Sequence, residues 1–295
     1  MGDDAPLAVL SDTYRGMHHY FRQNFSQVTN PPIDSLREHR VMSLKTRFGN
    51  LKNVLDQDNS QTEILTLDSP FVSARRFAEI TKRAATSAQT IDCTFPIGNP
   101  TSLQTELGRI RSEAEEAVRA GANHLILTDE NQSADRAGMP MILATSAVHQ
   151  HLIDKGLRLR ASLIVASGEP REVHHFACLL GYGADAIYPF LAMESIGEDV
   201  ESGGRHWSGI TLARAQQNFV QAIEKGLLKI MAKMGISVIS SYRGGINFEA
   251  VGLSRAMVAE YFPGMLSRIS GIGVTGVQRQ IEKIHARAWR GSDAV

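Results

Sequence analysis

The chain has 295 residues, and its 31 Lys and Arg residues equal its 31 Asp and Glu residues in number. This balance excludes the basic excess that a nucleic-acid-binding surface needs, so we expect no nucleic-acid partner. The longest apolar runs, such as 125–127 and 139–144, are too short to span a bilayer, and acidic residues stand near the N-terminus where a signal peptide would carry Lys or Arg. Composition therefore predicts a cytoplasmic protein with no membrane partner.

The cysteines and histidines do not form a recognisable metal site. The two cysteines, Cys93 and Cys178, are too few for an iron–sulfur cluster or a Cys-rich zinc site, and we interpret them as buried structural thiols. The pairs 149/151 and 174/175 do not have the spacing that places two ligands on one face of a helix. We therefore predict no metal in this chain.

Residues 1–60 differ in pattern from the rest, and we interpret them as an N-terminal helical segment that packs on the main body. One helix is expected over 14–25 and a second over 34–48. The segment Thr29-Asn30-Pro31-Pro32 separates them, because proline is excluded from helix interiors.

Residues 61–289 repeat one sequence pattern, in which a short aliphatic or β-branched run and a few polar residues precede an amphipathic helix. The expected strands cover 63–67, 90–95, 124–128, 161–165, 184–188 and 236–240. The expected helices cover 73–85, 103–120, 140–155, 171–180 and 211–234. Apolar strands that alternate with helices predict a parallel sheet with crossover helices.

The predicted fold class is therefore α/β, with parallel βα units that form an incomplete or distorted barrel-like domain. An open doubly wound sheet is the second choice. The glycine-rich and charged stretch 195–209 is interpreted as a loop on the surface. Residues 290–295 are interpreted as a frayed tail or a truncated linker.

Asp129 and Glu130 directly follow the expected strand 124–128, at the edge where parallel α/β sheets usually carry their chemistry. Two carboxylates there could perform acid/base work. The structural alternative is that Asp129 bonds to the loop backbone while Glu130 is solvated. We favour the structural alternative, because adjacency in sequence does not position two carboxylates.

A second polar segment, Ser240-Ser241-Tyr242-Arg243-Gly244-Gly245, follows the expected strand 236–240. The hydroxyl of Ser241, the guanidinium of Arg243 and the N–H groups of Gly244 and Gly245 would suit a phosphate. A Gly-Gly turn is common, however, and the sequence carries no complete Gly-x-Gly-x-x-Gly motif. A structural turn is again the favoured interpretation, with a phosphate site as the alternative.

Several segments, read together and in order, resemble one family. They are MGDDAPLAVLS, FSQVTNPPIDSLRE, VMSLKTRFGN, LTDEN, PMILATSAVH, GLLKIMAKMGISVISSYRGG, NFEAVGLS and SRISGIG. The chain from residue 2 to about residue 289 is similar to the central domain of the glutamate synthase large subunit, in its NADPH-dependent and ferredoxin-dependent forms.

The resemblance implies a scaffold without catalytic residues of its own, placed between a glutaminase domain and an FMN domain. The parent enzyme's FMN and 3Fe–4S cluster belong to the flavin domain, so no cofactor is expected in this chain. The family's central domain helps to enclose an ammonia tunnel, and the resemblance points to Thr29 and Asn30 as side chains that face it. Surfaces that normally meet other domains would be exposed in the isolated chain, so self-association is an expectation.

One alternative from a different class stays open at this point. It is a self-sufficient flavin-binding or phosphosugar-binding enzyme on a partial (β/α) barrel. It would use the segment 241–245 for phosphate and Asp129 or Glu130 as acid/base.

Overall fold

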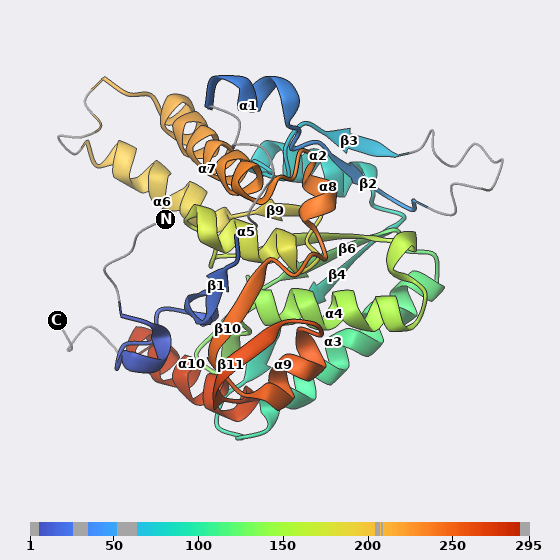
Figure 1. The fold of residues 1–295 in the computed structure, drawn as a ribbon, viewed down its shortest axis with the longest axis vertical. Coiled ribbons are helices and arrows are strands. Elements are labelled where there is room, and N and C mark those ends of the chain that lie inside the picture. The colour runs from blue at the N-terminus through green and yellow to red at the C-terminus, as the bar shows by residue number, and fades with distance from the viewer. Residues whose placement is uncertain (1–5, 26–34, 52–63, 204–206, 208, 290–295) are drawn as a thin grey trace.

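The computed structural model describes residues 6–25, 35–51, 64–203, 207 and 209–289 (Figure 1). Its main feature is a four-stranded parallel sheet in the order β4-β6-β8-β9. These strands span Ala88–Asp92, His124–Thr128, Ser162–Ala166 and Ala186–Tyr188. The α/β class with parallel βα units is therefore confirmed.

The strand order distinguishes the two predicted arrangements. Each new strand of the parallel sheet is added on the same side of the preceding one, as in a barrel, whereas a doubly wound sheet reverses direction at a switch point. An isolated parallel bridge between Phe71 and Ile187 continues the sheet beyond β9. Within the described residues the sheet does not close, so it is a barrel segment and not a complete barrel.

Both faces of the inner strands β6 and β8 are buried, which explains why these two strands are almost continuously apolar, whereas the edge strand β4 is partly exposed and more polar. One face packs on α3 (Ser102–Arg119), α4 (Met141–Asp154) and α5 (Val173–Gly181) in the larger apolar cluster. The other face packs on α2 (Ala74–Arg83) and on the hairpin of β2 (Thr46–Phe48) and β3 (Leu65–Leu67).

A second sheet joins the two ends of the described chain. It has the order β1-β10-β11, with β1 (Phe21–Gln23) antiparallel to β10 (Phe248–Leu253) and β10 parallel to β11 (Leu266–Ile272). A small antiparallel pair, β5 (Thr94–Pro96) and β7 (Arg136–Gly138), follows the carboxyl ends of β4 and β6.

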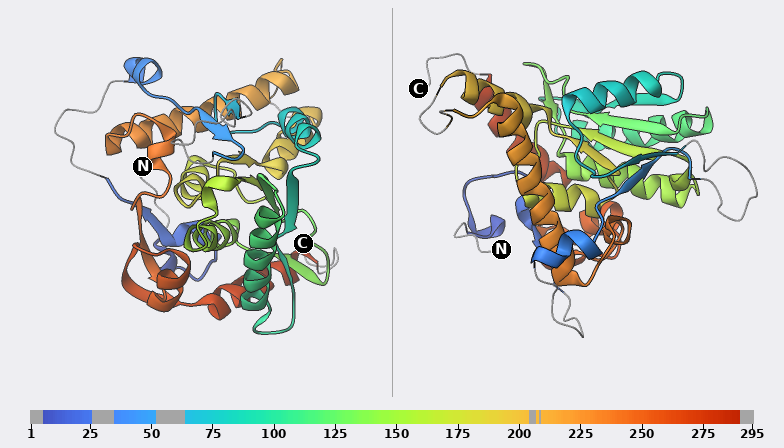
Figure 2. Two further views of the ribbon diagram at one scale, coloured as in Figure 1. Left: turned by 90° about the vertical axis from the view of Figure 1, so that its right-hand side faces the viewer. Right: turned by 90° about the horizontal axis from the view of Figure 1, so that it is seen from above.

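The remaining helices lie around these sheets (Figures 1 and 2). The long helix α7 has α1 packed against it, and α10 packs against α3. The bounds are α1 Ser35–Val41, α6 Phe190–Glu201, α7 Leu212–Met234, α8 Ile239–Tyr242, α9 Arg255–Tyr261 and α10 Val274–Ala288, with short 3-10 turns η1 Ala8–Leu10, η2 Met17–Tyr20 and η4 Arg158–Arg160.

The predicted N-terminal helices are largely wrong. The range 14–25 contains the 3-10 turn η2 and strand β1 in place of a helix, because Gly16 adopts φ 98° and β1 gains its hydrogen bonds from β10, far away in sequence. The range 34–48 begins with α1, but its last residues form β2. Tertiary pairing with β10 and β3 has overridden local helix propensity here.

Two further corrections concern the C-terminal half. The expected strand 236–240 makes only one bridge, between Val238 and Ser43, and then enters α8. The stretch 195–209 was expected to be a surface loop, but its first part is helical, because α6 continues to Glu201. The predicted boundary near residue 60 and the tail 290–295 lie outside the described residues, so the domain division stays a prediction.

The two cysteines have the environment expected of structural thiols. Cys93 and Cys178 are both buried and free, and burial raises the pKa of each thiol. Within the described residues, no helix combines the length and apolar character needed to cross a bilayer. In the same part of the chain, no group of three or more His, Cys, Asp or Glu side chains could hold a metal ion.

Candidate functional site

Asp129 marks the carboxyl end of β6 and is 2% exposed. Its Oδ2 accepts a hydrogen bond from Ser167 Oγ at 2.7 Å, and its Oδ1 accepts one from the Gly168 N–H at 3.0 Å. Burial raises the pKa of Asp129 to about 6, against the opposing effect of these two hydrogen bonds. The carboxylate therefore links the carboxyl ends of β6 and β8.

Glu130 is the second predicted acid/base candidate, and its side chain is exposed. Its backbone N–H bonds to Thr128 Oγ1 at 3.2 Å. The structure thus places the two adjacent carboxylates in different environments, Asp129 buried and Glu130 in solvent.

Glu169, which the sequence analysis did not single out, lies at the same edge as Asp129. Its Oε2 accepts a hydrogen bond from the Met141 N–H, at the start of α4, at 2.9 Å. Burial, and next the charge of Asp129, raise the pKa of Glu169 to about 8. Glu169 is therefore largely protonated at neutral pH, and can donate a hydrogen bond as a neutral carboxylic acid.

The N-terminal segment covers this edge of the sheet. The backbone carbonyl of His18 lies 2.9 Å from Nε2 of His174, and the rings of His18 and His175 lie 4.5 Å apart. His18 is 2% exposed, and its Nε2 has no hydrogen-bond partner. Burial first, and then the neighbouring His175, lower the pKa of His18 well below its usual value. Burial likewise lowers the pKa of His175 to about 4, so both rings are neutral at pH 7.

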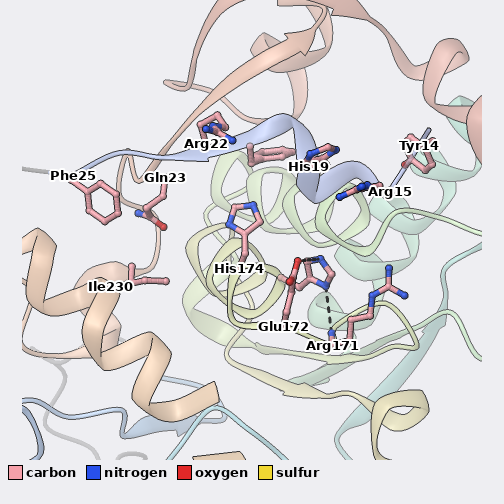
Figure 3. Close-up of a pocket in the computed structure, with 12 residues that line it drawn as sticks. Tyr14, Arg15, His19, Arg22, Gln23, Phe25, Arg171, Glu172, His174 and Ile230 are labelled. Carbon is pink, nitrogen blue, oxygen red and sulfur yellow. Dashed lines mark hydrogen bonds and ion pairs between the residues drawn. The ribbon is translucent and has the colours of Figure 1, made fainter. Parts of the chain in front are cut away.

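Two adjoining cavities open beneath the N-terminal segment. The larger, of about 870 Å³, lies between residues 14–25, the start of α5 and Ile230 of α7 (Figure 3). The smaller, of about 360 Å³, lies at the carboxyl edge of the sheet and is lined by Asp129, Glu169 and apolar side chains of α10. This is the edge at which parallel α/β sheets usually bind ligands.

The amino edge of the sheet carries a different cluster, centred on Asp185. Its Oδ2 lies 2.8 Å from Nη2 of Arg158, and its Oδ1 lies 2.7 Å from Nη1 of Arg243. Burial alone would raise the pKa of Asp185, but the two guanidinium groups outweigh it and hold the pKa below its usual value. Arg158 also donates to Nδ1 of His149 at 2.8 Å. These contacts fix the loops that precede β8 and β9.

This cluster accounts for Arg243 of the predicted phosphate segment. Besides Asp185, its guanidinium contacts the Ala184 carbonyl at 3.2 Å. The Gly244 N–H donates to the Gly181 carbonyl at 3.0 Å, and the Gly245 N–H donates to the Tyr242 carbonyl at 3.4 Å. Ser241 is exposed, and its N–H donates to the Val238 carbonyl. Three of the donors expected to bind a phosphate, the Arg243 guanidinium and the N–H groups of Gly244 and Gly245, are thus bonded within the chain, and the phosphate site stays a prediction.

The structure does not bring the two predicted sites together. Asp129 follows the end of β6, whereas Asp185 and its partner Arg243 lie before β9, at the opposite edge of the same sheet. Strands of five residues separate these edges by roughly 15 Å. An enzyme that combined the acid/base pair with the phosphate segment would need both at one edge. Thr29 and Asn30 lie outside the described residues.

The residues at both edges that sequence reasoning missed are Glu169, His18 and Asp185. Asp185 precedes a correctly predicted strand and Glu169 follows another, so strand termini were a usable signal for these two. No local signal marks His18, because the segment that holds it was expected to be helical.

The sequence of this chain is similar to glutamate synthases over almost its whole length. A sequence model described as the glutamate synthase central domain matches residues 1–254. The NADPH-dependent glutamate synthase large chain of Azospirillum brasilense is 56% identical over 98% of this chain, and that of Bacillus subtilis is 40% identical over the same share. A ferredoxin-dependent glutamate synthase of Synechocystis is also 40% identical. This α/β protein with a partial parallel barrel belongs to the family of glutamate synthase central domains.

The chain spans only 19% of the length of these relatives. Among solved structures, a flavocytochrome b2 mutant with benzoylformate aligns with 66% of this chain and 40% of its own, at 12% identity and a TM-score of 0.40. A likeness this low supports no statement about a ligand.

Proposed function

We propose that this chain is the connecting domain of a glutamate synthase, a scaffold between a glutaminase domain and an FMN domain. In this role it takes part in forming glutamate from glutamine and 2-oxoglutarate and helps to enclose the path of ammonia. The observation that carries the proposal is that almost the whole chain aligns with about a fifth of the length of glutamate synthase large chains, and that the matching family model is described as their central domain. Its partners are then the remaining domains of such an enzyme.

The surface of the second sheet supports contacts with further domains. Strand β11 is an edge strand of this sheet, and Leu266 and Ile269 on it are 56% and 51% exposed. Exposed apolar side chains on an edge strand are typical of a surface that another chain or domain covers. In the isolated chain the same surface is a site for self-association.

The two polar clusters support a structural role and not a catalytic one. Asp129 bonds to Ser167 and Gly168, and Asp185 bonds to Arg158 and Arg243, so each carboxylate holds neighbouring strand ends. We propose that this chain carries no catalytic residue and no cofactor, and that Thr29 and Asn30 face the ammonia path.

A flavin titration tests the cofactor part of this proposal. The purified chain is expected to show no flavin absorbance bands and no heat of binding on addition of FMN. Bound flavin with a dissociation constant in the micromolar range, about −8 kcal/mol, would contradict it and favour the alternative of a self-sufficient flavin enzyme. The variant Arg243→Gln would then show whether the segment 241–245 holds the flavin phosphate.

A further inference from the structure

The larger and the smaller cavity meet at a junction formed by four side chains that line both. These are Tyr14 and Arg15 from the N-terminal segment, Arg171 from the loop before α5, and His175 from the first turn of α5. Figure 3 shows Arg15 on the N-terminal segment above the larger cavity and Arg171 below it, on the same side of the view. The junction therefore lies between two segments that are far apart in sequence and are held together by the contact of His174 with the His18 carbonyl.

Two arginine side chains stand at this junction. Within the part of the chain that the structure describes, the guanidinium groups of Arg15 and Arg171 have neither an ion pair nor a hydrogen bond. Glu172, which also lines the larger cavity, lies 3.1 Å from Nε2 of His175. Because His175 is neutral at pH 7, this contact is a hydrogen bond and not a neutralising ion pair. Arginine stays charged at all relevant pH values, and its planar group of donors fits carboxylate and phosphate oxygens.

A second, independent observation is the unpartnered nitrogen of His18. Its Nε2 is buried without a hydrogen-bond partner, and the ring lines the smaller cavity beside Arg15 and Arg171. Buried polar atoms are nearly always hydrogen-bonded in folded proteins. A buried nitrogen without a partner beside a cavity therefore indicates that a bound molecule supplies the hydrogen bond. A ligand atom at the junction would supply that partner.

The two carboxyl groups that line the smaller cavity differ in charge. Asp129, with a pKa of about 6, is mostly ionised at pH 7, and its two oxygens accept hydrogen bonds from Ser167 Oγ and the Gly168 N–H. Glu169 is mostly a neutral acid at pH 7, because burial and Asp129 raise its pKa to about 8. A neutral carboxylic acid can donate its proton to an anion, so Glu169 is compatible with one nearby.

We propose that this junction binds a small dianion carrying carboxylate or phosphate groups, held by Arg15 and Arg171, with His18 Nε2 as a hydrogen-bond partner. Two fixed positive charges favour a dianion over a monoanion, and the combined cavities accommodate a small metabolite. This binding site goes beyond the proposed scaffold role and does not depend on it.

Calorimetric titration of the purified chain tests the proposal. The probes are inorganic phosphate and succinate as dianions and acetate as a monoanion, at pH 7.5 and constant ionic strength. We expect saturable one-site binding of at least one dianion, at least tenfold tighter than acetate. Which dianion binds more tightly distinguishes a phosphate ligand from a dicarboxylate. Absence of saturable binding by both dianions would overturn the proposal.

Substitutions locate the binding. Arg15→Gln and Arg171→Gln are expected to weaken dianion binding at least tenfold each, whereas the control Arg83→Gln, on the exposed side of α2, leaves it unchanged. Binding that survives both substitutions, or that Arg83→Gln weakens equally, would mean general charge screening and would overturn the site. Both arginines are exposed, so folding is expected to persist. If one of the two variants does not fold, the dianion affinity of the other variant tests the site.

Discussion

Asp185 is the residue whose loss is expected to cost most, because it neutralises two guanidinium groups near the amino edge of the parallel sheet. Asp185→Asn keeps the size of the side chain but leaves Arg158 and Arg243 without their carboxylate. Removing one partner from a buried ion pair typically costs about 3–5 kcal/mol. Urea denaturation at pH 7 is expected to show a loss of this order in the free energy of unfolding.

The matched control is Asp154→Asn, at an exposed position at the end of α4. It is expected to change the free energy of unfolding by less than about 0.5 kcal/mol. Equal effects of the two substitutions would mean that the Asp185 cluster does not stabilise the fold. Because the pKa of Asp185 is lowered, its contribution is present above the unfolded pKa of about 4 and is lost as the pH falls through the folded value.

Glu169 gives the opposite pH dependence. A carboxyl group with a raised pKa binds more protons in the folded than in the unfolded chain. Its contribution is therefore complete below the unfolded pKa of about 4.3 and is lost as the pH rises through about 8. Glu169→Gln removes this titration and keeps an oxygen for the Met141 N–H. Between pH 5 and pH 8.5, the variant is expected to gain more than about 1 kcal/mol of stability relative to the parent chain.

Denaturation curves of both proteins at the two pH values measure this difference. The exposed Glu116→Gln on α3 is the control and should follow the parent chain at both. A Glu169→Gln variant that also follows the parent chain at both pH values would show that Glu169 titrates normally.

For single residues, the sequence predicted the place in the secondary structure better than the contacts of the side chain. Asp129 was placed correctly at the end of a strand, and its role as acid/base or structural residue stays a prediction. The partners of Arg243 could not be predicted, because Asp185 is distant in sequence and meets it only through packing. Glu169 follows a predicted strand and could have been noticed there, whereas His18 lies in a segment that was expected to be helical.

At the scale of elements, the contact between β10 and β11 is the most sensitive point. A Cβ atom added to Gly271 would lie 2.0 Å from the backbone oxygen of Gly252, a distance that side-chain adjustment cannot relieve. Gly271→Ala therefore forces the two strands apart where their register already shifts. We expect a loss of more than about 2 kcal/mol in unfolding free energy, or a chain that does not accumulate in folded form.

Gly197→Ala in α6 is the control for this prediction. A Cβ atom there meets only Leu212 Cδ1, at 4.0 Å, and alanine is a better helix former than glycine. Its melting temperature is expected to stay the same or to rise. If Gly271→Ala melted at the temperature of the parent chain, the strands would not approach as closely as described.

The elements that the sequence predicted well are those with strong local signals. The strand 124–128 and the helices near 103–120, 140–155 and 211–234 were placed within a residue or two, because strand length, apolar periodicity and caps agree there. Thr211 caps α7 through its side chain, and Gly235 ends it at φ 70°. The sequence analysis missed strands β1, β10 and β11. Strand β1 pairs with β10, more than 200 positions away, and β11 pairs in parallel with β10, so neither pairing leaves a local signal in the sequence.

At the scale of the whole molecule, the resemblance named the family, and the strand order supports the barrel-like interpretation over the doubly wound one. The predicted boundary near residue 60 and the predicted ammonia-path residues Thr29 and Asn30 lie outside the described residues, so both stay predictions. The role in a complete enzyme therefore requires an experiment on a complete enzyme.

The most direct measurement uses a chimera of the Azospirillum brasilense large chain, in which this chain replaces the segment it matches. Rates of glutamate formation are measured with glutamine and, separately, with free ammonium as the nitrogen source. We predict that the chimera retains both rates within about tenfold of the parent enzyme. Replacing Thr29 and Asn30 by leucine is expected to lower only the glutamine-dependent rate. A folded chimera that hydrolyses glutamine at the parent's rate, yet forms glutamate only from added ammonium, would contradict the connecting role.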